Sequence, residues 1–156
     1  MNQAFRQQPD EAELWEPIPN SVISREGHVV DTSGLRWHLP STTGGATTLK
    51  FDKICSLRFR YALMRYCIHI IKVTSAAYAY NTFKDCWRFL LLVNPEFNRV
   101  DIADFEAELI TYVEKVVATT RRDHKLYQIS RVKAWYLWGA QYLSEVGFSS
   151  EYACVL

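Results

Sequence analysis

Apolar residues recur at helical spacing through most of the chain, and Gly, Pro and capping residues mark where the predicted helices end. Residues 55–94 contain neither Gly nor Pro, and their apolar positions repeat every three to four residues. We predict one helix over residues 56–73, with Ser56 as its N-cap. A second covers residues 75–93, because Pro95 disfavours helical geometry at the residue before it.

The rest of the C-terminal half also has a helical pattern. Asp101 can cap a third helix that ends near residue 117, and Thr119 and Thr120 then interrupt the pattern. A long fourth helix is predicted over residues 122–143, closed by a turn at Gly147. One more short helix begins at Ser149 or Ser150.

Short β-prone runs precede the helices. Residues 28–30 and 35–39 flank the turn-forming cluster at 31–34, which predicts a hairpin between them. A second turn at 40–45 leads to a third strand over 47–51, and Trp37 is expected to dock this β unit on the helices. Residues 1–20 contain three prolines and are expected to form an extended tail.

These elements predict a mainly α protein in which four helices, packed orthogonally or as a bundle, follow a small β hairpin. The division along the chain is a tail over 1–20, a β-hairpin appendage over 21–54 and a helical domain over 55–148. Residues 149–156 begin a linker or a further segment. The 156 residues suit one domain with a substantial core.

Charge is unevenly distributed, although the formal net charge of the whole chain is only +1. Residues 56–99 carry a net charge of +5 and residues 118–143 carry +4, whereas residues 100–117 between them carry −4. Each basic block can present its own field within a Debye length of about 10 Å. The distribution, rather than the sum, therefore permits a polyanionic partner.

Cations and donors within the basic blocks cluster on single helix faces. One face of the first predicted helix carries Arg58, Arg65, His69 and Lys72. One mostly basic polar sector of the second carries Asn81, Lys84, Asp85 and Arg88. Arg, Lys and Gln supply the donors that phosphate oxygens and base edges accept. The candidate contacts to DNA are Arg58, Arg65, Lys72, Lys84, Arg88, Arg121, Arg122, Lys125, Gln128 and Arg131. A solvated helix face is the alternative interpretation of each stripe.

Other kinds of site lack their usual sequence signals. The four cysteines form no C-x-x-C pair, so neither a metal nor a cofactor is expected, and Cys67 and Cys86 fit apolar helix faces. No nucleophile with a base and an orienting group can be assembled, so we expect no enzyme activity and no small-molecule substrate. No apolar run reaches the ~18 residues of a membrane span. Reduced thiols fit a cytoplasmic protein.

Three ordered stretches resemble one protein family. Thr74-Ser75-Ala76-Ala77-Tyr78 followed by Phe83, Trp87 and Leu90 is similar to the run that opens the SAM-like core-binding domain of phage integrases, the tyrosine recombinases. Residues 129–138 and Val146-Gly147-Phe148 resemble that domain's last helix and the turn beyond it. Residues 30–37 resemble a hairpin that precedes the helices in some large mobile-element integrases.

This resemblance implies an N-terminal module that grips double-stranded DNA through basic helix faces. In that family a separate catalytic domain carries an Arg, a His-x-x-Arg and a nucleophilic Tyr, and here no His is followed three residues later by Arg. We therefore expect DNA binding without cutting or joining, with self-association on DNA. The implied location is the nucleoid in the cytoplasm, for a bacterial or phage-encoded protein. The alternative function is a helical protein-interaction or oligomerisation module.

Overall fold

The helices of the protein begin and end close to where the sequence predicts. This computed structural model describes residues 15–40, 47–54, 56–93, 107, 110–112, 114–115, 122–143 and 146. The three helices with complete bounds are α1 (Leu57–Val73), α2 (Ala76–Val93) and α4 (Arg122–Tyr142). Within these ranges the protein is mainly helical, with two small antiparallel strand pairs.

Local capping explains the positions at which α1 and α2 begin. The Ser56 hydroxyl accepts a hydrogen bond from the backbone N–H of Phe59 at 3.3 Å, which confirms Ser56 as the N-cap of α1. The Ser75 hydroxyl accepts one from the N–H of Tyr78 at 3.2 Å, at the start of α2. Two serines therefore satisfy backbone donors that no helical carbonyl can reach.

The region predicted as a third helix is described in part. Residues 107, 110–112 and 114–115 are helical, and the buried Tyr112 packs edge-on against Phe89 of α2 with ring centroids 5.1 Å apart. Burial raises the pKa of Tyr112 to about 12, so its hydroxyl stays protonated. The Asp101 cap, residues 1–14 and residues 149–156 lie outside the described residues.

The predicted hairpin between residues 28–30 and 35–39 is wrong. The strands are β1 (Ser21–Ile23), β2 (Val29–Asp31), β3 (Arg36–Leu39) and β4 (Thr47–Lys50), and they pair as β1–β2 and β3–β4. The reversal lies at Gly27, whose φ of 87° suits a tight turn. Asp31 accepts hydrogen bonds from the backbone N–H and the hydroxyl of Ser33, so residues 31–34 lead from one pair to the next.

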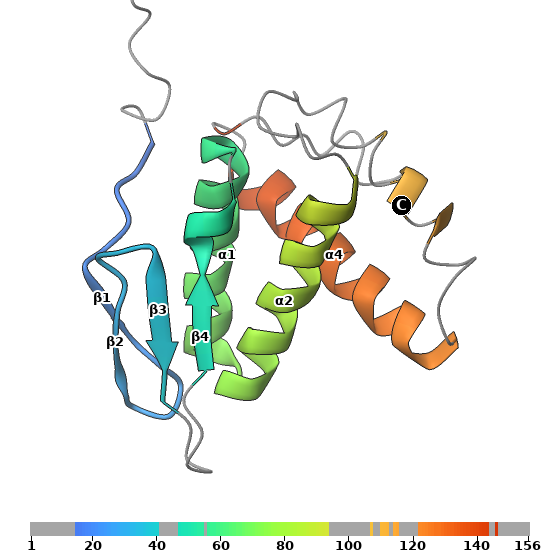
Figure 1. The fold of residues 1–156 in the computed structure, drawn as a ribbon. Coiled ribbons are helices and arrows are strands. Elements are labelled where there is room, and N and C mark those ends of the chain that lie inside the picture. Colours follow the sequence, from blue (N-terminus) through green and yellow to red (C-terminus); the bar gives the residue numbers. More distant parts are fainter. Residues whose placement is uncertain are drawn as a thin grey trace, which may run out of the picture.

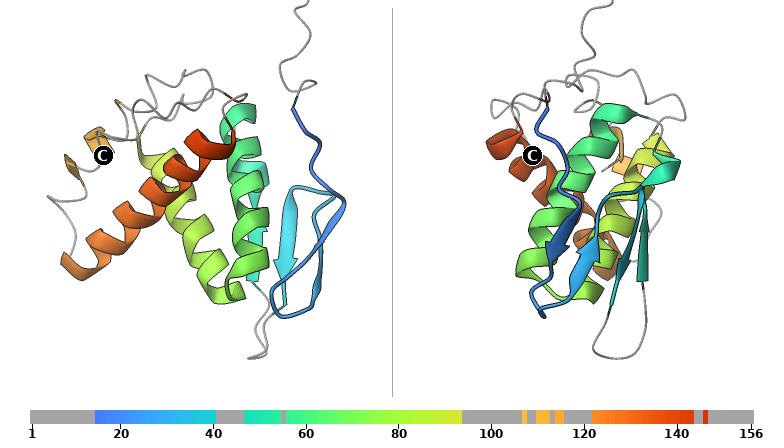
Figure 2. Two further views of the ribbon diagram at one scale, coloured as in Figure 1. Left: turned by 180° about the vertical axis from the view of Figure 1, so that it is seen from behind. Right: turned by 90° about the vertical axis from the view of Figure 1, so that its left-hand side faces the viewer.

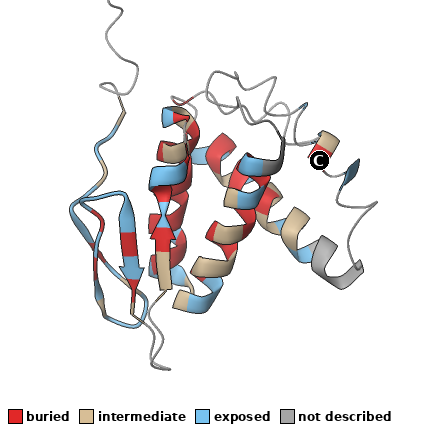
Figure 3. Cartoon of the chain, in the orientation of Figure 1, coloured by how far each residue is buried: buried red, intermediate tan, exposed pale blue. Residues whose placement is uncertain are grey.

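Helix α2 lies at the centre of the arrangement. Helix α1 runs beside it, α4 crosses behind both, and β4 lies in front, as Figure 1 and the reverse view in Figure 2 show. Buried residues line the sides on which the helices face one another (Figure 3). Opposite sides of α2 therefore meet different partners, the strand layer on one side and α4 on the other.

A single apolar core joins the strands to the helices. Trp37 of β3 is fully buried and packs on Phe51 with ring centroids 4.5 Å apart. Phe51, in the short 3-10 helix η2 (Phe51–Lys53), packs edge-on against Phe83 of α2 at 5.1 Å. Trp37 thus helps to dock the β unit on the helices, as the sequence predicts, and the buried residues of 21–54 join the same core as those of the helices.

The end of the predicted tail is extended but packed on α1. The Trp15 ring lies 4.8 Å from that of Tyr61, and the Tyr61 hydroxyl donates a hydrogen bond to the Glu16 carbonyl at 2.6 Å. Ile18 also packs against the core. Residues 15–20 therefore belong to the folded unit.

The turn at Gly27 provides a test of the strand arrangement. A Cβ at Gly27 would meet no atom within 4 Å, so Gly27→Ala carries only the backbone strain of a positive φ, about 1–2 kcal/mol. Gly34→Ala is the matched control, since a Cβ there also has open space and the φ of Gly34 is not positive. We expect urea unfolding to show the loss for Gly27→Ala alone, and equal losses would contradict the turn.

Candidate functional site

An open groove lies between the strand layer and α2. Its volume is about 250 Å³. Thr48 and Lys50 of β4 and Lys53 of η2 form one side. Helix α2 provides the other side with five residues, namely Tyr80, Phe83, Lys84, Trp87 and Arg88.

Regular backbone geometry explains why these side chains meet. Positions 80, 84 and 88 are successive i, i+4 neighbours on α2, and positions 83 and 87 follow the same face. Thr48 and Lys50 alternate with the buried Leu49, so both project from the same side of β4. The apolar contact between Phe51 and Phe83 holds the two sides of the groove together.

Lys53 is held in place by contacts on either side of it in the chain. The Arg60 guanidinium donates two hydrogen bonds to the Ile54 carbonyl, at 3.0 and 2.8 Å. Asp52 pairs with Arg36 at 3.0 Å, and this hydrogen bond lowers the pKa of the Asp52 carboxyl below its ordinary value. The acid next to Lys53 is therefore already matched by another cation.

The groove carries a strong excess of positive charge. Four of its lining residues are cations, and none is an acid. Among the described residues, Lys50, Lys53, Lys84 and Arg88 make no ion pair with a carboxylate. The ammonium of Lys84 lies 5.8 Å from the centre of the Tyr80 ring, within the range of a cation–π interaction. A groove with this charge attracts anions.

Arg131, one of the candidate DNA contacts, lies in an ion pair instead. Its Nη1 donates to Oδ2 of Asp85 at 2.6 Å, and the Asp85 side chain is only 3% exposed. The rings of Tyr78 and Tyr127 lie 5.6 and 5.7 Å from the Arg131 guanidinium carbon. The expectation that Asp85 shares the polar sector of Lys84 and Arg88 is wrong, because Asp85 points to α4 and compensates this cation.

The basic stripe predicted on α1 lies partly against protein groups and partly on the open surface, where His69 and Lys72 are exposed. Nη2 of Arg65 lies 3.2 Å from Oε2 of Glu16 in the N-terminal segment. The His69 ring stacks near Trp138 of α4, with centroids 5.6 Å apart. Lys72 is exposed in the last turn of α1, where a cation complements the helix dipole.

The structure therefore brings together part of the predicted set. Lys84 and Arg88 line one groove, whereas Arg65 and Arg131 are in ion pairs. Arg58 and Gln128 are half-buried on α1 and α4. Arg122 and Lys125 belong to α4, but their side chains lie outside the described residues, as does Arg121 altogether.

Sequence reasoning missed Lys50 and Lys53. Both lie in residues 1–55, a segment with a negative net charge, so the distribution of charge along the sequence did not identify them as candidate contacts. In the predicted strand over residues 47–51, alternation places Lys50 on the opposite face from the buried Leu49. This pattern could have identified Lys50, but not Lys53, as an outward-facing cation. No pattern in the sequence indicates that β4 would lie against α2.

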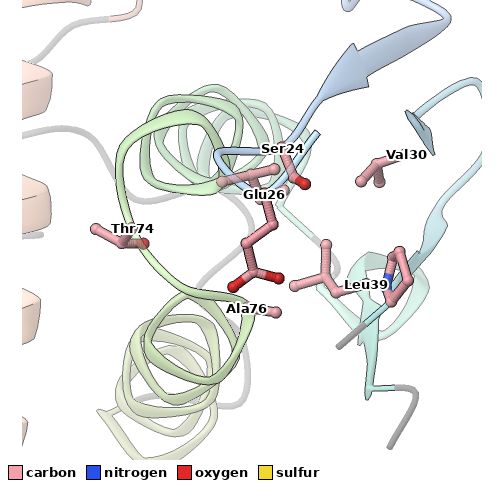
Figure 4. A pocket seen from close by; sticks show the side chains of 8 residues that line it. Ser24, Glu26, Val30, Leu39, Thr74 and Ala76 are labelled. Atoms are coloured by element: carbon pink, nitrogen blue, oxygen red, sulfur yellow. The ribbon is translucent and has the colours of Figure 1, made fainter. Parts of the chain in front are cut away.

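A second hollow is much smaller, with about 10 Å³, roughly the room that one water molecule needs. It lies where the β1–β2 turn meets the corner between α1 and α2. Figure 4 shows the Glu26 carboxylate directed toward Ala76, the first residue of α2, where a negative charge complements the helix dipole. This hollow fits a structural contact better than a ligand.

The described residues hold no other chemical centre. Cys67 and Cys86 are free and buried, as predicted, and burial raises the pKa of both thiols, which keeps them protonated and poorly reactive. No group of three metal-ligating side chains occurs in the described part of the chain. Nor does any helix within that part combine the length and hydropathy needed to cross a bilayer.

Comparisons with models of protein families, with curated proteins and with solved structures each found no match to this chain. The groove and the resemblance of the sequence motifs are therefore the features that point to a function.

The buried pair between Arg131 and Asp85 provides a test of the site geometry. Arg131→Met would leave the Asp85 carboxylate buried without its cation, and we expect a loss of about 3–5 kcal/mol in urea unfolding. Adding Asp85→Asn should recover part of this loss, because the buried charge is then gone. Arg36→Ala, which removes an exposed ion pair, is the control and should change the urea midpoint of unfolding very little. Equal effects of Arg36→Ala and Arg131→Met would contradict the pairing.

Proposed function

We propose that the chain is a DNA-binding module of the kind that precedes the catalytic domain in tyrosine recombinases, built on a SAM-like helical bundle. It binds DNA without cutting or joining it. The motifs over residues 74–90 and 129–148 support the family, and the basic groove supports the binding.

The observation that carries the proposal is the meeting of four cations from three elements in one groove. Lys50, Lys53, Lys84 and Arg88 come from β4, η2 and α2, and no acid lines the groove with them. With a volume of about 250 Å³, the groove is too small to enclose a duplex and would contact a stretch of its backbone. Neutralising phosphates there releases condensed counterions, so the affinity should fall steeply with salt.

Two of the DNA contacts predicted from the sequence, Arg131 and Arg65, already pair with acids, and we leave them out of the proposal. A phosphate that drew Arg131 away would leave Asp85 buried and uncompensated, a cost of several kcal/mol. Arg65 is already near Glu16. The contacts we propose are therefore Lys84 and Arg88, together with Lys50 and Lys53.

The test is fluorescence anisotropy with a labelled DNA duplex at two salt concentrations. Lys84→Gln and Arg88→Gln should each weaken binding at every sequence tested. Each should also reduce the slope of log affinity against log salt by about one, since one phosphate contact is lost.

Arg25→Gln is the matched control, because Arg25 is exposed in the β1–β2 turn and does not line the groove. It should bind as the unaltered protein does. Binding that is absent or independent of salt would refute the proposal, and so would an equal loss in all three variants.

A second function is favoured by the outer face of α4. Five exposed positions follow one another at helical spacing along this 21-residue helix, and none of them is charged. They are Tyr127, Ser130, Ala134, Leu137 and Gln141. An uncharged stripe on an outer face is typical of an interaction surface.

This second function predicts self-association through α4. Light scattering should then show a mass that rises with protein concentration, and Leu137→Glu should return it to that of a monomer. Lys133→Glu, on a neighbouring side of α4, controls for the added charge. A constant monomer mass at all concentrations would exclude the self-association.

A further inference from the structure

The groove contains more than phosphate binding requires. Three of the residues that line it are aromatic, and they share one face of α2 with the two cations of that helix. A bare phosphate gains nothing from aromatic surface, whereas a flat ring does. The lining thus pairs a surface for a ring with a surface for an anion.

The three aromatic side chains differ in what they can offer. Phe83 is buried at the floor of the groove, where it packs on Phe51. Tyr80 is half-buried, and the Lys84 ammonium lies near its ring. Trp87 is also half-buried, and its indole N–H is buried without an acceptor among the described residues, so packing alone holds the ring. Trp87 is therefore the ring best suited to stack on a ligand.

The size of the groove limits the ligand. Sites that enclose drug-sized molecules have volumes of roughly 300–1,000 Å³. At about 250 Å³ and open to solvent, this groove accommodates one flat ring and the anionic group attached to it. A base held in a duplex is stacked on both faces and cannot also stack on Trp87.

We infer that the groove binds a single unpaired nucleotide, with its base against Trp87 and its phosphate among Lys50, Lys53, Lys84 and Arg88. The inference rests on the proposed function, because it refines the ligand of the same groove. A nucleotide of this kind can be free in solution or belong to an unpaired stretch of a DNA strand.

The test uses the full chain and three probes in anisotropy. One is a labelled thymidine hexamer, the second an abasic hexamer with the same phosphates, and the third is unlabelled thymidine monophosphate as a competitor. One stacked base should make the thymidine hexamer bind roughly five- to 150-fold tighter than the abasic hexamer.

Variants assign this difference to Trp87. Trp87→Leu should abolish the preference for bases, whereas Trp87→Phe should keep much of it because a ring remains. Tyr142→Leu is the matched control, since Tyr142 is an exposed aromatic residue on α4 outside the groove. Because the comparison of the two hexamers needs only the unaltered protein, it stays decisive even where Trp87→Leu fails to fold.

The outcomes separate this inference from the proposed function. Equal binding of both hexamers, or binding of a duplex alone, overturns the inference and leaves DNA binding in place. Binding of neither the duplex nor the hexamers overturns both. Base-dependent binding of the hexamer without binding of the duplex supports the inference and refutes duplex binding alone. Competition by thymidine monophosphate would support a free nucleotide as ligand. Base-dependent hexamer binding without that competition would support an unpaired strand.

Discussion

The contact between Phe51 and Phe83 is the constraint on which the arrangement depends. Phe51 follows β4 directly and reaches Phe83 of α2, and Trp37 of β3 also packs on Phe51. The three side chains are buried, and burying an aromatic residue stabilises a fold by several kcal/mol. A three-residue 3-10 helix has little stability of its own, so this contact fixes Lys50 and Lys53 opposite Lys84 and Arg88.

Two groups of cations differ in their partners among the described residues: those paired with a carboxylate and those that line the groove without one. Arg131 lies at the α2–α4 contact, where a charge is tolerated because the buried Asp85 compensates it at 2.6 Å. Lys84 directly precedes Asp85, but successive side chains of a helix point about 100° apart. Lys84 therefore lies on the strand side of α2, whereas Asp85 faces α4. Adjacent residues on one helix therefore serve the core on one side and the groove on the other.

Some features of the protein followed from the order of its residues alone. Ser56 and Ser75 cap their helices through hydrogen bonds that span only three residues, so the starts of α1 and α2 could be predicted without knowledge of the fold. The burial of Cys67 and Cys86 followed from helical periodicity. Lys84 and Arg88 share a face of α2 for the same local reason.

Other features were decided only when distant segments met. The β1–β2 and β3–β4 pairing, the extended segment packed on Tyr61 and the pairs made by Arg65 and Arg131 join residues as many as 49 positions apart in the chain. The local sequence pattern does not specify such partners, because an exposed cation can pair with any of several carboxylates and a β-prone run with any of several other runs. The sequence determined which faces are basic; burial of Phe51 against Phe83 decided which basic residues face one another.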